Sequence, residues 1–161
     1  MEVLRAADRD SGAGKQLNIV RSKEVTMTVP STFSGGCACE AVRYDCSISP
    51  ITMVNCHCRD CQRASGSAYS PTVVVPTANV VLVRGTPRYH EITVANGHVA
   101  RRAFCGECGT PLFASSSARA EMTGIRAGSL DDPSWYRAER DVWTGSAQPW
   151  DILSPGTVKV R

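Results

Sequence analysis

The spacing of the cysteines constrains this 161-residue chain more than any other feature of its sequence. Seven of the eight cysteines fall into three short clusters: "CAC" at 37–39, "CHCRDC" at 56–61 and "CGEC" at 105–108. A disulfide within a C-x-C pair would close a small, strained ring, so a disulfide framework is not expected. The clusters instead have the spacing of metal ligands, and thiolate sulfur favours zinc.

Four of these thiols form the pattern of a closed zinc site, C-x-C followed much later by C-x-x-C. The predicted ligands are Cys37, Cys39, Cys105 and Cys108, which we name the four-thiol group. The glycines in and after the second pair permit turns that direct backbone N–H groups at sulfur. We expect a structural zinc that closes a long loop and fastens the start of the folded region to its middle.

The remaining cluster, Cys56, Cys58 and Cys61, supplies only three of the four donors that tetrahedral zinc requires. We name it the three-thiol group. Either Cys46 completes the site, or the fourth position is open to a water or a thiol. The alternation in "RYDCSIS" favours Cys46 as a core residue, and His57, between two ligands, should point to the opposite side. An open zinc lowers the pKa of what it binds, so the three thiols are also candidate catalytic residues.

The composition and periodicity of the chain change near residue 30. Residues 1–30 are polar and non-periodic and predict a flexible arm, whereas residues 31–161 predict one mainly β domain. Short runs rich in β-branched residues alternate there with turn residues, and the expected strands lie within Ala41–Cys46, Ile51–Cys56, Pro71–Pro76, Asn79–Gly85, His98–Cys105 and Glu121–Gly128. The best candidate for a helix is Arg59–Ala64, and no helix longer than about two turns is expected.

Charge and hydropathy restrict the partners. The net charge is +3, and the basic residues are scattered, so a nucleic-acid surface is not expected. No run of about 18 apolar residues predicts a membrane span. The first 26 residues lack an apolar block typical of a secretory signal, which favours a cytoplasmic location. Most arginines should pair with surface carboxylates, although Arg59, Arg63 and Arg102 could bind the carboxylates of a small ligand.

Five segments together carry a family resemblance: "GGCAC…VRY", "NCHCRDCQRASG", "RRAFCGECGTPLF", "GSLDDP" and "QPW". In this order and spacing they resemble the glutathione-dependent formaldehyde-activating enzymes, a family that includes the centromere-protein-V-like proteins. The resemblance implies an Mss4-like β-tent of small twisted antiparallel sheets around a structural zinc on the four-thiol group. It also implies a second, labile zinc on the three-thiol group, beside the site of a thiol substrate such as glutathione.

The chain departs from the family pattern at two positions. Glu40 stands where a glycine is common, and Asp141 stands where a histidine is usual, so a different substrate is possible for this protein. Two further features favour structural roles. "DDP" at 131–133 predicts a turn rather than an acid–base or metal-binding pair. Trp143 and Trp150 are expected to pack in the core, the alternative being that they line a ligand pocket.

These observations support two functions. The first is a zinc-dependent carbon–sulfur lyase that acts on a thiol–aldehyde adduct such as S-hydroxymethylglutathione, formed from glutathione and formaldehyde. The alternative is a non-catalytic interaction module stabilised by zinc. The two differ in whether the three-thiol group is open to a ligand.

Overall fold

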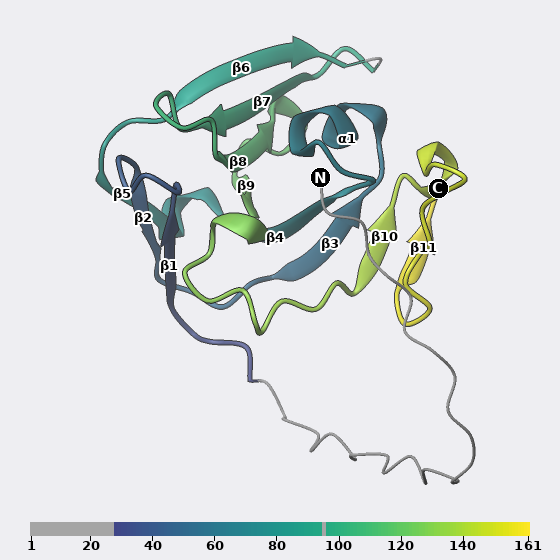
Figure 1. Cartoon of the computed structure of the whole chain (residues 1–161), viewed down its shortest axis with the longest axis horizontal. Coiled ribbons are helices and arrows are strands. Elements are labelled where there is room, and N and C mark those ends of the chain that lie inside the picture. The colour runs from purple at the N-terminus through teal and green to yellow at the C-terminus, as the bar shows by residue number, and fades with distance from the viewer. Residues whose placement is uncertain (1–27, 95) are drawn as a thin grey trace, which may run out of the picture.

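The computed structural model describes residues 28–94 and 96–161 of the chain. These residues form short strands, one short α-helix and four 3-10 turns (Figure 1). The strands are β1 (Phe33–Gly36), β2 (Arg43–Cys46), β3 (Thr52–Cys56), β4 (Ser70–Pro76), β5 (Val80–Arg84), β6 (Arg88–Thr93), β7 (Val99–Phe104), β8 (Pro111–Ser116), β9 (Met122–Arg126), β10 (Arg140–Val142) and β11 (Val158–Val160). The other elements are α1 (Arg59–Ser65), η1 (Thr77–Asn79), η2 (Ser117–Arg119), η3 (Ala127–Ser129) and η4 (Thr144–Ser146).

The mainly β class is confirmed, and all six runs expected to form strands do so. Five strands were not predicted: the longer β6 and β8, which carry mixed or serine-rich sequences, and the short β1, β10 and β11. The predicted arm over residues 1–30 lies almost wholly outside the described residues. Within the described residues no helix is long and apolar enough to cross a membrane.

The strands form two sheets. β1, β2 and β5 make a three-stranded sheet, and the other eight follow the order β11-β10-β3-β4-β9-β8-β7-β6. Neighbouring strands are antiparallel except β10, which runs parallel to both β3 and β11. β10 and β11 follow each other in the chain, so this parallel pair requires a crossover connection, which residues 143–157 supply. The C-terminal part of the chain thus forms one edge of the larger sheet.

The apolar core joins the two sheets. Tyr44 from the small sheet and Leu112 and Ile125 from the large sheet are fully buried in one cluster. The Tyr44 ring meets the Phe113 ring edge-on at 4.9 Å, and its hydroxyl contacts the Ser129 hydroxyl at 2.8 Å. Each fully buried aliphatic side chain stabilises the fold by about 1.5–3 kcal/mol. The core therefore fixes the small sheet, and the loop after β1, against the large sheet.

The helix α1 is short because its sequence carries both a start and a stop signal. The Cys58 side chain accepts a hydrogen bond from the Cys61 N–H at its N-terminus. At its other end Gly66 adopts φ 67°, and its N–H donates to the Gln62 carbonyl. A left-handed glycine ends helices in this way. The prediction of a helix over Arg59–Ala64 is thus confirmed, with one more residue at its C-terminus.

Candidate metal centres and an adjoining cavity

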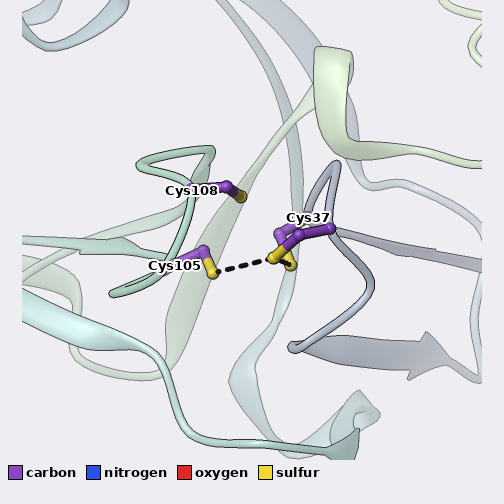
Figure 2. A group of neighbouring side chains, drawn as sticks. Cys37, Cys105 and Cys108 are labelled. Carbon is purple, nitrogen blue, oxygen red and sulfur yellow. Dashed lines mark hydrogen bonds between the residues drawn. The ribbon is translucent and has the colours of Figure 1, made fainter.

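The four-thiol group unites two loops that are far apart in the sequence. Cys37 and Cys39 follow β1, and Cys105 and Cys108 lie in the turn after β7; their sulfurs all lie within 4.8 Å of one another. The Cys39 Sγ is 3.5 Å from the Cys37 Sγ and 3.7 Å from the Cys105 Sγ, across a separation of 66 residues. Figure 2 shows the labelled side chains of both loops converging on one point.

Backbone N–H groups point at these sulfurs, as the glycine-containing turns predicted. The Val42 N–H donates to Cys37 Sγ at 3.2 Å, and the Glu107 N–H donates to Cys105 Sγ at 3.4 Å. Such donors offset the negative charge of a metal held by four thiolates. The donor set and its surroundings therefore fit a zinc ion.

Thr110 ties the two halves of the four-thiol group together. Its hydroxyl accepts from the Ala38 N–H at 3.1 Å and lies 3.1 Å from the Cys108 Sγ. Hydrogen bonds from the Thr110 side chain and backbone lower the pKa of Cys108 to about 5. Gly109, at φ 75°, closes this turn with a hydrogen bond to the Cys105 carbonyl at 3.0 Å. The loop thus favours a thiolate at position 108.

Glu40 occupies the turn that links Cys37 to β2, and it adopts φ 61°. This left-handed conformation is easy for glycine and unfavourable for other residues. The Glu40 side chain is exposed, while its N–H donates to the Cys37 carbonyl at 3.0 Å. The turn therefore keeps the shape that a glycine would adopt, although the residue is a glutamate.

The three-thiol group comes from one short segment. Cys56 ends β3, Cys58 caps α1 and Cys61 lies in its first turn, with their sulfurs within 4.8 Å of one another. The Cys56 and Cys58 sulfurs are 3.6 Å apart. All three residues are half-buried rather than sealed. The segment thus gathers three metal-binding donors on a face that remains accessible.

One thiolate is favoured within this group. Hydrogen bonds from the Cys56 and Cys58 thiols, helped by the positive charges of Arg126 and Arg102, lower the pKa of Cys61 to about 2. The contacts with Cys58 and Cys61, together with burial, raise the pKa of Cys56. Negative charge therefore concentrates at Cys61, on the side of the group that faces the two arginines.

Cys46 does not complete the three-thiol group. It is 2% exposed, lies in the core and joins neither thiol group among the described residues. Burial raises its pKa, so it stays a neutral thiol. The expectation that Cys46 is a core residue is confirmed, and all eight cysteines are free of disulfides.

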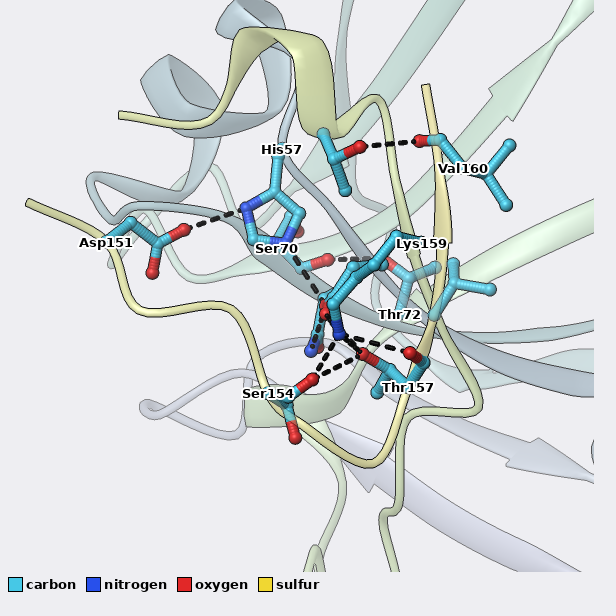
Figure 3. A network of polar contacts seen from close by, with 12 residues as sticks. His57, Ser70, Thr72, Asp151, Ser154, Thr157, Lys159 and Val160 are labelled. Carbon is cyan, nitrogen blue, oxygen red and sulfur yellow. Dashed lines mark hydrogen bonds and ion pairs between the residues drawn. The ribbon is translucent and has the colours of Figure 1, made fainter. Parts of the chain in front are cut away.

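His57 points away from the sulfurs, as expected, and is only 1% exposed. Its Nε2 lies 3.2 Å from the Asp141 Oδ1, and its Nδ1 lies 2.9 Å from the Asp151 Oδ2 (Figure 3). Its ring also packs against Tyr69 at 5.1 Å. Because His57 lies between Cys56 and Cys58 in the chain, this anchorage holds the three-thiol segment in place from behind.

Asp141, which departs from the family pattern, is a buried structural residue. One of its oxygens accepts from Asn55 Nδ2 at 2.9 Å, and the other accepts from Lys159 Nζ at 3.0 Å and from the Thr157 hydroxyl. Burial alone would raise the pKa of Asp141, but the hydrogen bonds from Thr157, Lys159, Asn55 and His57 hold it well below its usual range. This carboxylate ties β3, β10 and the C-terminal strand β11 together.

A cavity of about 590 Å³ opens beside the three-thiol group. All three of its cysteines line the cavity, and none of the four-thiol group does. Loop residues such as Asn96, Arg119 and Trp143 form part of the remaining wall, and most of the rest comes from one face of the large sheet, because alternate residues of a strand point to the same side. The sheet residues are Val54 of β3, Thr72 of β4, Ala100 and Arg102 of β7, Ala114 and Ser116 of β8, Met122, Gly124 and Arg126 of β9, and Val142 of β10.

Small residues make room for this cavity. Ala114 and Gly124 are paired across β8 and β9, and a Cβ atom at Gly124 would come within 2.7 Å of the Thr72 Cγ2. The opposite face of the same strands packs into the core through residues such as Ile125. One face of the sheet therefore stabilises the fold and the other is open to a ligand of drug-like size.

Only one of the three arginines predicted from the sequence as candidates for binding a ligand lies at the cavity. Arg102 lines the cavity, whereas Arg59 and Arg63 do not; Arg59 instead donates to the Gln62 side chain. Arg126, which sequence reasoning missed, lies at the cavity wall and is 7% exposed. The signal available in the sequence was the spacing of Arg126 and Gly124, which places both residues on the same face of β9. Only the pairing of β9 with β4 reveals that this face borders the cavity.

The expectation that Trp143 and Trp150 pack in the core is wrong, since they are 57% and 69% exposed. Trp143 lines the cavity and adopts φ 60°, because it turns the chain between β10 and η4. The buried tryptophan is Trp135, at 5% exposure. The predicted turn at 131–133 does form, with the Asp132 carboxylate accepting from the Ser134 N–H at 2.9 Å.

Fold and site together define a cysteine-rich β protein with two thiol groups able to hold metal ions, one of them at a cavity. Residues 32–146 match the family described as "Glutathione-dependent formaldehyde-activating enzyme", and the chain belongs to this family. A structural-genomics crystal structure of a Rhodobacter sphaeroides protein is similar in fold, with a TM-score of 0.52 and 17% identity over 80% of this chain and 99% of that chain. No curated protein matches the sequence.

Proposed function

We propose that the chain binds two zinc ions, a structural one on Cys37, Cys39, Cys105 and Cys108 and a labile one on Cys56, Cys58 and Cys61. The clustering of the sulfurs within 4.8 Å in each group supports this assignment. Four thiolates complete a tetrahedral site, whereas three leave one position for a substrate sulfur or a water. The four-thiol zinc would stabilise the β domain over residues 31–161, and the three-thiol zinc would take part in the reaction.

The reaction that the site supports best is that of a carbon–sulfur lyase on a thiol–aldehyde adduct such as S-hydroxymethylglutathione. One observation carries this proposal: the three-thiol group, and not the four-thiol group, lines a cavity large enough for a small thiol. Family membership supports glutathione as the thiol and formaldehyde as the aldehyde. The eight free cysteines support a reducing compartment such as the cytoplasm.

In the synthetic direction, the thiol sulfur bonds to the formaldehyde carbon, the carbonyl π bond opens, and the thiol proton ends on the new hydroxyl oxygen. Lysis is the reverse of these steps. Zinc on the three-thiol group would supply Lewis acidity and lower the pKa of a thiol or water beside it. The cavity wall holds the thiol in place, and the small residues Ala114 and Gly124 leave space for the aldehyde. Holding both reactants together supplies the main rate advantage.

The alternative is an interaction module without catalysis. Such a module needs only the four-thiol zinc to hold its fold. A second thiol group beside a cavity, held by the buried His57 and Asp141, has no role in a purely structural domain. The cavity therefore favours the enzyme.

Zinc stoichiometry tests the two-centre assignment. Wild-type protein purified with zinc should carry two ions per chain, and Cys58→Ser should carry one, because serine keeps the N-cap of α1 but not the thiolate. Cys46→Ala, which alters a thiol in neither group, is the matched control and should keep two ions. A wild-type chain with a single zinc that Cys58→Ser retains would contradict the three-thiol centre.

Exchange NMR tests the reaction itself. With glutathione and formaldehyde present, the protein should speed interconversion of free glutathione and its adduct by at least roughly tenfold. Cys58→Ser should return the exchange to the uncatalysed rate, and Cys46→Ala should not. Equal exchange rates with and without wild-type protein would exclude this activity and leave the interaction module.

A further inference from the structure

Two arginines at the cavity wall have no carboxylate partner among the described residues. Arg126 is 7% exposed, and its Nη1 donates to two neutral hydroxyls, those of Ser70 and Thr72, the latter at 3.1 Å. The structure gives its guanidinium no other hydrogen bond within residues 28–94 and 96–161. Its hydrogen bonds go only to neutral oxygens, and the nearby negative charge is that of the three-thiol group, so the approach of a further anion would be favourable.

The hydrogen-bond donors of the Arg102 side chain are even less satisfied than those of Arg126. The Arg102 Nε is buried without a hydrogen-bond partner, and its side chain makes no hydrogen bond or ion pair with any other residue in the described part of the chain. Arg101, next to it in β7, shows the contrast, since it pairs with Glu91 at 2.9 Å and lies over the Tyr89 ring. Arg101 also borders the large cavity, so the two neighbours differ in their partners: Glu91 neutralises the Arg101 charge, and no carboxylate neutralises that of Arg102 in the described part of the chain.

No carboxylate of the described residues neutralises the two guanidiniums on their other side, away from the large cavity, either. Both also line a second cavity of about 200 Å³, whose wall holds His90 and apolar or glycine residues but no carboxylate. On the near side, a zinc ion held by three thiolates would carry one net negative charge, which offsets only one of the two arginines. Asp60 and Arg119 also line the large cavity, and their opposite formal charges cancel in its net charge, without an ion pair between the two side chains. One positive charge remains for a ligand.

The distance between this charge and the three-thiol group suits a small thiol. Ser70, which accepts from Arg126, is paired with Cys56 across β3 and β4. Arg126 lies on β9, the next strand along, opposite Thr72. Adjacent strands are about 4.8 Å apart, so the guanidinium lies within roughly 10 Å of the Cys56 position. A molecule with a thiol and a carboxylate separated by a few bonds spans this gap.

We propose that Arg102 and Arg126 form a carboxylate seat, which makes this protein select thiols that carry a carboxylate. The seat rests on the proposed function for the identity of the thiol end, but it is defined by the two arginines alone. A guanidinium holds a carboxylate through two parallel N–H donors, and the unused donors of both residues are available for this geometry. Neutral thiols would lack this contact.

Calorimetry with S-methylglutathione tests the seat without catalysis, because the methylated sulfur cannot react. Wild-type protein should bind S-methylglutathione roughly 10- to 100-fold more tightly than its diethyl ester, the effect of one charge-assisted contact. Arg126→Gln keeps a donor for the Ser70 and Thr72 hydroxyls, and it should lose this preference while binding the ester as before. Arg102→Gln should act in the same direction. Arg140→Gln, at an exposed position of β10, should leave the affinity for both ligands unchanged.

The outcomes separate the seat from the reaction. Equal binding of acid and ester by the wild type, or a full preference retained in both Arg126→Gln and Arg102→Gln with unchanged zinc content, overturns the seat. If the wild type binds the acid preferentially but leaves glutathione exchange unaccelerated, the seat stands and the lyase fails. If exchange is accelerated equally for glutathione and 2-mercaptoethanol, in wild type and in Arg126→Gln, the lyase stands and the seat fails.

Discussion

The four-thiol group and the three-thiol group use the same donor atom in two different architectures. The first joins the loop after β1 to the turn after β7, across 66 residues, and two of its cysteines, Cys37 and Cys105, lie in the core. The second draws all its sulfurs from the segment between β3 and α1, and it faces a cavity.

The difference shows how loop length and surroundings determine whether a bound metal stabilises the fold or can exchange its ligands. A metal that closes a long loop holds distant parts of the fold together, so its binding energy becomes folding energy. A metal held by one short segment closes almost no loop and can be lost while the sheets remain. This difference supports the proposal that the three-thiol group, and not the four-thiol group, exchanges ligands at a site of reaction.

The largest expected effect follows directly from this contrast. Cys105→Ser should lower the free energy of unfolding by at least about 3 kcal/mol, because it removes both a proposed zinc ligand and a buried thiol from the core. Cys58→Ser should lower it by less than about 1 kcal/mol, since serine still caps α1. Chemical denaturation in the presence of zinc measures both values.

Equal losses in the two variants would break the comparison. In that case the three-thiol group would also support the fold, and its role as an exchangeable site would be wrong. Cys46→Ala calibrates the cost of removing a buried sulfur that belongs to neither group.

The next effect concerns the support behind the three-thiol group. Asp141→Asn removes the charge that meets Lys159 and His57, and it should cost about 2–4 kcal/mol of stability. It should also weaken zinc binding at the three-thiol group by roughly 10- to 100-fold and leave the four-thiol group unaffected. Zinc titration with a chromophoric chelator measures the two sites separately. Asp45→Asn, at an exposed position, is the control.

The same carboxylate predicts a pH dependence. The pKa of Asp141 is lower in the folded state than in the unfolded chain, so its contribution is complete above the unfolded value of about 3.9 and decreases as the pH falls toward the folded value. The wild type should therefore lose stability below about pH 5 more steeply than Asp141→Asn. Parallel stability curves between pH 3 and 6 would show that Asp141 is not held as an anion.

Much of this arrangement was readable from the sequence, because metal-ligand spacing is a local signal. C-x-C, C-x-x-C and the three closely spaced cysteines at 56–61 identified both thiol groups without any knowledge of the sheets. The strands with β-branched residues, such as those around Val73 and Val81, were predicted for the same reason. In contrast, β6 and β8 were not predicted, because β6 mixes tyrosine and isoleucine with charged residues and β8 is rich in alanine and serine, so neither shows a run of β-branched residues.

The parts that sequence reasoning missed depend on pairing between distant strands. Arg126 belongs to the site only because β9 lies beside β4, which places its guanidinium next to Ser70. The role of Asp141 depends on β10 lying between β3 and β11, where Lys159 reaches it. Trp143 was expected in the core because tryptophans usually pack there, but the turn after β10 exposes it at the cavity.

The smallest expected effect lies at the edge of the four-thiol group. Glu40→Gly should raise the free energy of unfolding by about 1 kcal/mol, because φ 61° is unfavourable for a residue with a Cβ atom. The hydrogen bond from its N–H to the Cys37 carbonyl belongs to the backbone and should persist. Glu40→Ala keeps the Cβ and removes only the carboxylate, so it should stay within about 0.5 kcal/mol of wild type.

This pair of variants separates backbone strain from charge at the four-thiol group. If Glu40→Ala stabilised the fold as much as Glu40→Gly does, the repulsion between the carboxylate and the thiolates would be the cause, and the turn would carry no strain. Under either cause, zinc binding at the three-thiol group and glutathione exchange should stay unchanged, since Glu40 does not line the cavity. A change in exchange rate would mean that the two thiol groups are coupled through the small sheet, and the division between a stabilising centre and a reactive centre would no longer hold.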